Sequence, residues 1–311
     1  MVDKIIASGF RKNFLEQFHK NLFPILQEYE SERKNRLCLG VFFLGLGIIG
    51  SVAIAPFTLT AGDADVAVLT VAPTVVGLMV WDYIKKSFEN KIKERIMPTV
   101  CSCFGELRWE YGYPKHVNEN DFSRSLLIPA FTTCSFDDIF YGVYNDTPYA
   151  IVEGDYTFKA GKHSHQVFDG IILRIKVSKK FFSHTVIRPD ALFKIIDFGR
   201  LERTEFEDVV FEKKFDVYTD DPVEARYLIT PAFMQRLNTI KVAFNADKIS
   251  CAFYQGELLI ALATRKDLFN IGSLICPMDD VRPYYQMFEE IDSIVNLIDY
   301  LKLDKNPHKK L

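Results

Sequence analysis

Four charged side chains within seven residues form the densest polar group that the sequence offers for binding chemistry. They are Asp220, Asp221, Glu224 and Arg226, and they follow a short apolar run that is typical of a strand. An arginine guanidinium binds a carboxylate or phosphate group through two parallel hydrogen bonds. This segment is therefore the predicted ligand-binding or partner-binding site.

A structural role for the same residues is the favoured alternative. Asp220 and Asp221 precede Pro222, and an acidic cap followed by proline in the first turn is typical of a helix start. Glu224 lies two residues before Arg226, and residues at that spacing do not face each other on a helix. We therefore expect the acids to cap the helix and Arg226 to be buried in an ion pair with a cap acid or a strand neighbour.

Other residue types that support catalysis or metal binding do not converge in this sequence. His163 and His165 could share one face of a strand, but no third ligand accompanies them. Cys101 and Cys103 lack the second cysteine pair of a zinc site. No Ser-His-Asp or Cys-His arrangement has a spacing that fixes its geometry. We predict no metal and no cofactor, and we assign no catalytic residue.

Two apolar segments near the N-terminus predict a transmembrane hairpin. The first covers residues 37–58 and is uncharged over about 22 residues, enough to cross a hydrocarbon core of roughly 30 Å. The second covers residues 66–81 and is short for a span. Residues 45–50 match the dinucleotide motif GxGxxG, but they lie inside the uncharged run rather than between a strand and a helix. Small residues at every fourth position favour close helix packing: Gly47, Ser51 and Ala55.

Charges beside the two segments predict the orientation of this hairpin. The loop between the segments has two acids and no cation, whereas cations flank both outer ends: Arg33, Lys34, Arg36, Lys85, Lys86, Lys91, Lys93 and Arg95. Because cations favour the cytoplasmic side, both termini are expected in the cytoplasm. The prediction is an integral membrane protein, with the lipid bilayer as a partner.

Amphipathic helices are expected on both sides of the hairpin. Apolar residues recur at three or four positions before the first segment, and again after the second: Phe10, Phe14, Phe18, Leu22, Ile25 and Tyr29, then Ile84, Phe88, Ile92, Ile96 and Val100. These helices would form a stalk within residues 1–105. A protein partner or a homo-oligomer through the stalk is one possible use of its apolar faces.

The remainder of the chain, residues 106–311, is predicted to be a cytosolic α+β domain. About seven short strands, mostly joined by hairpins, are followed by late helices, which favours an antiparallel sheet or a partly open barrel. The formal net charge of −3 gives no global positive field, so nucleic acid is not an expected partner.

Several segments resemble a bacterial membrane family known as domain of unknown function 3137. The most specific stretch contains Phe215-Asp216-Val217-Tyr218, then Glu224 to Pro231, which reads EARYLITP, and then Met234. Phe168-Asp169-Gly170 resembles the family's central segment, and Pro24-Ile25-Leu26 resembles its pre-membrane helix. Pro222 departs from the family, which often has another polar residue there. The resemblance implies a similar topology and, with the predicted orientation, a location in a bacterial inner membrane. It supplies no activity or catalytic residue.

The sequence thus favours a membrane-anchored binding or scaffold module. The anchor, the stalk and the lack of a catalytic signature support it. The alternative is a membrane-bound enzyme whose site is dispersed along the chain, and a deep polar pocket containing Arg226 would favour that alternative.

Overall fold

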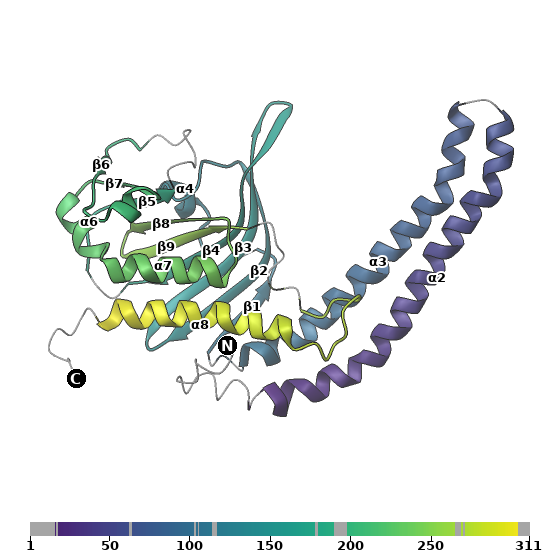
Figure 1. The fold of residues 1–311 in the computed structure, drawn as a ribbon, viewed down its shortest axis with the longest axis horizontal. Helices are drawn as coiled ribbons and strands as arrows, with labels where there is room; N and C mark the ends of the chain where they lie inside the picture. The colour runs from purple at the N-terminus through teal and green to yellow at the C-terminus, as the bar shows by residue number, and fades with distance from the viewer. Residues whose placement is uncertain are drawn as a thin grey trace. The chain divides into compact units, whose positions relative to one another are not determined.

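The chain forms two compact units in the computed structural model (Figure 1). The first contains residues 1–104 and 270–284, and the second contains residues 105–269 and 285–311. The structure describes residues 16, 18–61, 64–102, 104, 106–113, 117–177, 180–189, 198–264, 269 and 271–303. The predicted α+β class is confirmed, with two long apolar helices first and an antiparallel sheet after them.

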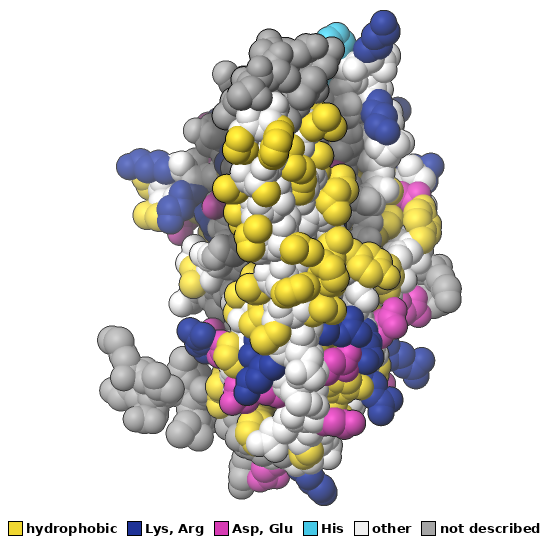
Figure 2. All heavy atoms as spheres, turned by 90° about the vertical axis from the view of Figure 1, so that its right-hand side faces the viewer, with side chains coloured by type: hydrophobic (Ala, Val, Ile, Leu, Met, Phe, Trp, Pro, Cys, Tyr) yellow, Lys and Arg dark blue, Asp and Glu magenta, His cyan; other side chains and the backbone are white. Residues whose placement is uncertain are grey.

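The first unit is built on two long helices. A π-helical turn, η1 (Phe18–Leu22), leads into α2 (Phe23–Ala61), and α3 (Ala64–Ser102) returns alongside α2. Each predicted apolar segment therefore continues into its stalk within one helix of 39 residues. Of the predicted first stalk helix, Phe18 and Leu22 belong to η1, and Phe10 and Phe14 lie outside the described residues. Figure 2 shows hydrophobic side chains gathered over the middle of this hairpin, with Lys, Arg, Asp and Glu side chains at one end of the apolar region.

Small residues hold the two helices close together, as the four-residue spacing predicted. A Cβ atom at Gly47 would lie 2.5 Å from the backbone oxygen of Pro73, so any side chain there would push the helices apart. One turn further along, the Ser51 and Thr74 hydroxyls form a hydrogen bond of 2.7 Å. This bond satisfies both hydroxyls inside an apolar contact.

Residues 270–284 pack with the helical hairpin rather than with the sheet, which the sequence did not indicate. The buried Arg33 side chain donates to the Leu274 carbonyl oxygen at 3.0 Å, and Glu30 accepts from the Met278 amide at 3.0 Å. Glu89 of α3 accepts from the Leu274 amide at 3.2 Å. Residues 271–278, which we call the strap, are thereby tied to both helices.

The strap also covers the apolar face of the stalk. Ile92 packs against the strap at Gly272, where a Cβ atom would lie 2.3 Å from the isoleucine side chain. Phe88, Ile96 and Val100, which share this face, are buried within the single chain. An oligomer through the stalk stays a prediction, and it would need a surface other than this face.

The second unit contains one open sheet of nine strands in the order β1-β2-β3-β4-β9-β8-β5-β7-β6, with every pair antiparallel. Their bounds are β1 (Arg108–Tyr111), β2 (Thr133–Tyr144), β3 (Thr147–Ala160), β4 (His163–Lys176), β5 (Thr185–Pro189), β6 (Glu202–Thr204), β7 (Phe215–Thr219), β8 (Lys248–Tyr254) and β9 (Glu257–Ala263). The strand order does not return on itself, so the predicted sheet is found in its open form rather than as a barrel.

Turn chemistry explains two of the hairpins in this meander. Asn145 and Asp146 both have positive φ, of 46° and 59°, which a two-residue turn between β2 and β3 requires. Gln255 and Gly256 also have positive φ and connect β8 to β9. Asn, Asp and Gly are the residue types that most readily adopt positive φ, so Asn145, Asp146 and Gly256 favour turns at these positions.

Helices cover the two faces of the sheet. On one face lie α7 (Pro231–Ala243) and α8 (Arg282–Leu303, of which residues from 285 onward belong to this unit), side by side in Figure 1. The opposite face carries α4 (Asn120–Arg124) and the segment after it, while α5 (Val209–Glu212) and α6 (Pro222–Leu228) lie near β7.

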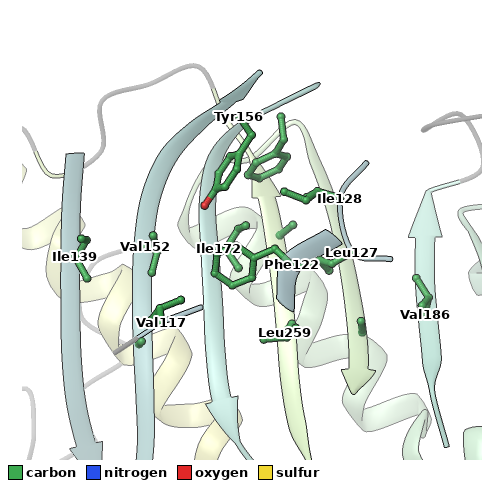
Figure 3. Close-up of a cluster of buried hydrophobic side chains, with 14 residues drawn as sticks. Val117, Phe122, Leu127, Ile128, Ile139, Val152, Tyr156, Ile172, Val186 and Leu259 are labelled. Atoms are coloured by element: carbon green, nitrogen blue, oxygen red, sulfur yellow. The ribbon is translucent and has the colours of Figure 1, made fainter. Parts of the chain in front are cut away.

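The α4 side of the sheet contains a buried hydrophobic cluster. In Figure 3, Phe122 and Leu127 face Val152, Ile172 and Leu259 on three neighbouring strands. Tyr156 is fully buried beside Phe122, with ring centroids 6.2 Å apart. This cluster covers only part of the sheet face, and the part left open forms the cleft described below.

Candidate functional site

The structure uses the predicted acids at the β7–α6 junction to organise the backbone. Asp221 is the N-cap of α6, and its side chain accepts from the Val223 and Glu224 amides at 2.9 and 3.0 Å. Asp220 accepts from the His184 amide at 2.8 Å. The helix-capping role favoured from the sequence is therefore confirmed for Asp221, while Asp220 holds the neighbouring loop.

Glu224 performs a similar role from the first turn of α6. Its carboxylate accepts from the Ser183 amide at 2.6 Å and from the Phe182 amide at 2.9 Å. Partial burial raises the pKa of this carboxyl, but the hydrogen bonds from Ser183 and Phe182 outweigh that effect and bring the pKa below its ordinary value. Glu224 thus stays ionised at neutral pH and ties residues 182–183 to α6.

The expectation that Arg226 is buried in an ion pair is wrong. Its side chain is exposed and donates to two backbone oxygens, those of Pro222 and Glu205, both at 3.4 Å. The helix turns Arg226 toward solvent, because the opposite side of α6 is the one that buries Ala225 and Leu228. A ligand-binding role for this junction stays a prediction. Its three acids already accept hydrogen bonds from backbone amides.

Alanine substitution should separate the roles of two of these residues. Arg226→Ala is expected to change the free energy of unfolding by no more than about 0.5 kcal/mol, as at ordinary surface positions. Glu224→Ala should cost about 1–2 kcal/mol, because it removes the acceptor for two amides. Denaturant unfolding of the full chain in detergent measures both, and a larger loss for Arg226→Ala than for Glu224→Ala would contradict these assignments.

A cleft of about 410 Å³ lies on the sheet face beside the hydrophobic cluster. Strand register explains its composition, since residues paired across antiparallel strands share a face. Arg108 pairs with Tyr141, Tyr141 with Ala150, and Ala150 with Arg174, which makes a row across four strands. The next row contains Val143 paired with Pro148, and Lys176 paired with Glu257. All eight residues line the cleft, and Arg226 does not.

The cations of this cleft differ in their partners. Arg174 donates to Glu257 at 2.6 Å and lies 3.6 Å from Asp121, so its charge is neutralised. Arg108 and Lys176 are exposed, and neither forms an ion pair with any residue that the structure describes. The cleft therefore presents two available positive charges beside an apolar wall. No local sequence pattern predicts the cleft, because its residues come from five separate strands and the loops beside them.

Two candidate metal groups also appear in the sheet unit. Asp137, Asp138 and Glu153 have carboxylate oxygens within 4.8 Å of one another, at a bulge in β2 where Asp138 also accepts from the Trp109 indole at 2.6 Å. Their proximity alone does not make a metal site, and we assign none. His163 and His165 are exposed near the β3–β4 turn, and the His165 ring lies 5.5 Å from that of Phe158.

Glu290 is a buried acid that the sequence analysis did not single out. The side chain lies on α8 with no exposed surface, and Gln286 donates to one of its oxygens at 2.9 Å. Its other carboxyl oxygen has no hydrogen-bond partner among the described residues. Burial raises the pKa of Glu290 to about 8, so the carboxyl holds a proton at neutral pH.

This buried carboxyl should make stability depend on pH. Its pKa is raised on folding, so the proton that it holds stabilises the fold fully below about pH 4.5, and this contribution is lost as the pH rises to about 8. At about 1.4 kcal/mol per pH unit the loss is at most about 5 kcal/mol. Glu290→Gln should therefore gain stability relative to the natural chain between pH 5 and 8. Unfolding curves of both proteins across that range test this, and a constant difference would contradict it.

Comparison with known proteins identifies a family over part of the chain. Residues 166–303 match a family model described as "Protein of unknown function (DUF3137)". This range runs from β4 to the end of α8, and it includes Gly170 and the β7–α6 junction. The resemblance noted from the sequence is thus confirmed there, and for the pre-membrane helix it stays a prediction.

One solved structure is similar, and it is titled "crystal structure of the mycobacterial trehalose monomycolate transport factor A, TtfA". The likeness has a TM-score of 0.36 and 11% sequence identity, and it covers 69% of this chain and 93% of that chain. Similarity at this level supports no argument about function. Comparison with curated proteins found no match. The family match is therefore the comparison that bears on this chain: its residues 166–303 are similar to the DUF3137 family, whose function is unknown.

Proposed function

We propose that this chain is a membrane-anchored binding module, with the cleft on its sheet unit as the ligand-binding surface. Two helices are long and apolar enough to cross a membrane, and only 11% of the most apolar window of each is buried. A core helix of a soluble protein would be mostly buried instead. Phe42, Ile49 and Met79 are exposed by 63%, 67% and 66%, which suits contact with lipid rather than water.

The proposal places both termini in the cytoplasm of a bacterial cell, with the anchor in the inner membrane. The basic flanks and the acidic loop of the hairpin support this orientation. Reporter fusions at Met1 and Leu311 test it. Activity of a cytoplasmic reporter is expected at both positions, and activity of an exported reporter at either position would overturn the orientation.

The cleft is the observation that carries the binding role. Its volume of about 410 Å³ falls within the range of small-molecule sites, roughly 300–1,000 Å³. Three of the strands in its floor, β2, β3 and β4, are paired on both sides, so the shape of the cleft is set by the fold itself. A preformed site of this kind loses little entropy when a ligand binds.

Native mass spectrometry of the full chain, purified from its own membranes in mild detergent, tests the binding role. A bound small molecule is expected on the natural chain. Val143→Trp should abolish it, because Val143 is exposed in the cleft and a tryptophan there would fill the space. Val242→Trp is the matched control, since Val242 is exposed on α7 outside the cleft. The same bound mass on all three proteins, or no bound mass on any of them, would contradict the proposal.

A further inference from the structure

We infer that the cleft binds an anion that carries an apolar group, such as an organic phosphate or carboxylate, and that Arg108 and Lys176 recognise its charge. The inference rests on the proposed function, because it specifies the ligand of the same cleft. It goes beyond that proposal by stating which chemistry is recognised and by which side chains.

The charge balance of the cleft favours an anion. Glu257 forms an ion pair with Arg174 at 2.6 Å, so these two side chains together present no net charge to a ligand. Of the remaining charged lining residues, Arg108 and Lys176 are cations and Glu106 is an acid, which leaves one net positive charge. Asp121 lies near Arg174, at 3.6 Å, and does not line the cleft. An anionic ligand would therefore gain charge-assisted hydrogen bonds that a cation could not.

The positions of the two cations indicate how they share a ligand. Arg108 lies on β1 and Lys176 on β4, three strand spacings apart, or about 14 Å between their backbones. Both side chains are long, and they line the cleft from opposite sides. A small anionic group between them is within reach of both side chains. Two separate ions would bind the cations but would not contact the apolar wall.

The apolar wall of the cleft indicates that the ligand also carries an apolar group. Val143 and Pro148 are paired across β2 and β3, the two strands between those that carry the cations, and both residues line the cleft. Val143 is exposed in the cleft. Covering it with a hydrocarbon or aromatic group is favourable by about 25 cal/mol per Å² of apolar surface removed from water. Inorganic phosphate alone would not gain this contribution.

Binding of small probes to the full chain in phosphatidylcholine nanodiscs tests the inference. Saturation-transfer NMR gives dissociation constants for phenyl phosphate, inorganic phosphate, phenol and benzylamine, with empty nanodiscs as the baseline. Phenyl phosphate is expected to bind most tightly of the four. Replacing Arg108 and Lys176 together by glutamine should weaken its binding about tenfold or more, since each change removes a charged contact.

Lys159→Gln is the matched control, because Lys159 is an exposed cation on the same sheet near the β3–β4 turn and outside the cleft. Its phenyl phosphate affinity should equal that of the natural chain. A second experiment measures binding of dihexanoyl phosphatidic acid. Tighter binding than that of phenyl phosphate would assign the anion to a lipid headgroup, and weaker binding would assign it to a soluble molecule. Either result supports recognition of an anion with an apolar group, provided that the double glutamine variant binds the preferred probe more weakly than the natural chain does.

Three results would overturn the inference: unchanged affinity in the double variant, tighter binding of benzylamine than of phenyl phosphate, or no binding of any probe. These failures differ from failure of the proposed function. A bound mass that Val143→Trp removes would keep the cleft as a binding site while the anionic ligand is discarded.

Discussion

Replacing Gly170 by alanine is expected to destabilise the sheet unit by about 3–5 kcal/mol. Gly170 lies on β4 with φ of 142°, a conformation that residues with a side chain rarely adopt. A Cβ atom there would lie 2.1 Å from the Leu262 backbone oxygen and 2.8 Å from the Thr264 amide. The substitution must therefore push β9 away from β4 at the centre of the sheet. Denaturant unfolding of the full chain in detergent measures the loss.

Gly161→Ala is the matched control for this prediction. Gly161 also has positive φ, of 60°, but no heavy atom lies within 4 Å of its Cβ position. The Gly161→Ala variant should lose only about 1 kcal/mol of the free energy of unfolding, which is the cost of the left-handed conformation for alanine. Similar losses for the two variants would show that the close approach of β4 and β9 is not what requires glycine at position 170.

The second large effect is expected at Arg33, which holds the strap to the stalk. Its guanidinium donates to both oxygens of Glu30, at 2.8 and 2.7 Å, and to the Leu274 carbonyl oxygen. The Arg33 hydrogen bond is the main reason that the pKa of Glu30 falls to about 2. Arg33→Met would leave the Glu30 carboxylate, 21% exposed, without its partner, at a cost of about 2–3 kcal/mol, below that of a fully buried pair.

Hydrogen exchange localises this loss. The amides of Leu274 and Met278 are bonded to Glu89 and Glu30, so peptides covering residues 271–281 report on the strap. Arg33→Met should speed their exchange roughly 30-fold, which corresponds to about 2 kcal/mol. Lys34→Met is the control, because Lys34 is exposed and its amine lies 3.5 Å from the same carboxylate. Unchanged exchange in Arg33→Met would mean that apolar packing alone holds the strap.

Local patterns in the sequence predicted the parts of this fold that depend on neighbouring residues. Asp221 caps a helix because its side chain reaches amides two and three positions ahead, a relation that is visible in the sequence. Gly47 and Ser51 pack against the partner helix because a four-residue period keeps small side chains on one face. The turn at Asn145 and Asp146 follows from residues that tolerate positive φ.

Features that depend on distant segments were not predictable in this way. Arg226 was expected in an ion pair because four charges lie close in sequence. Instead, Asp220 and Glu224 bond to residues 182–184, Asp221 caps α6, and the Arg226 side chain is left exposed to solvent. The strap begins 169 residues after the end of α3, and no local signal links it to the stalk. The cleft requires the register of β1, β2, β3, β4 and β9, which a single sequence does not specify.

Anchoring by the helical hairpin is the central claim of this account, and alkaline-carbonate extraction of membranes tests it most directly. The test variant carries Leu46→Arg, Ile49→Arg and Val76→Arg, all at exposed apolar positions of the hairpin. Each arginine opposes insertion by about 2.5–3.5 kcal/mol near the bilayer centre. The control places arginines at exposed valines of the sheet unit: Val209, Val210 and Val242.

The natural chain and the control should remain in the extracted membranes, and the hairpin variant should appear in the soluble extract. Release of the natural chain by carbonate, or retention of the hairpin variant with the membranes, would contradict the claim that residues 37–58 and 66–81 anchor this protein in a bilayer.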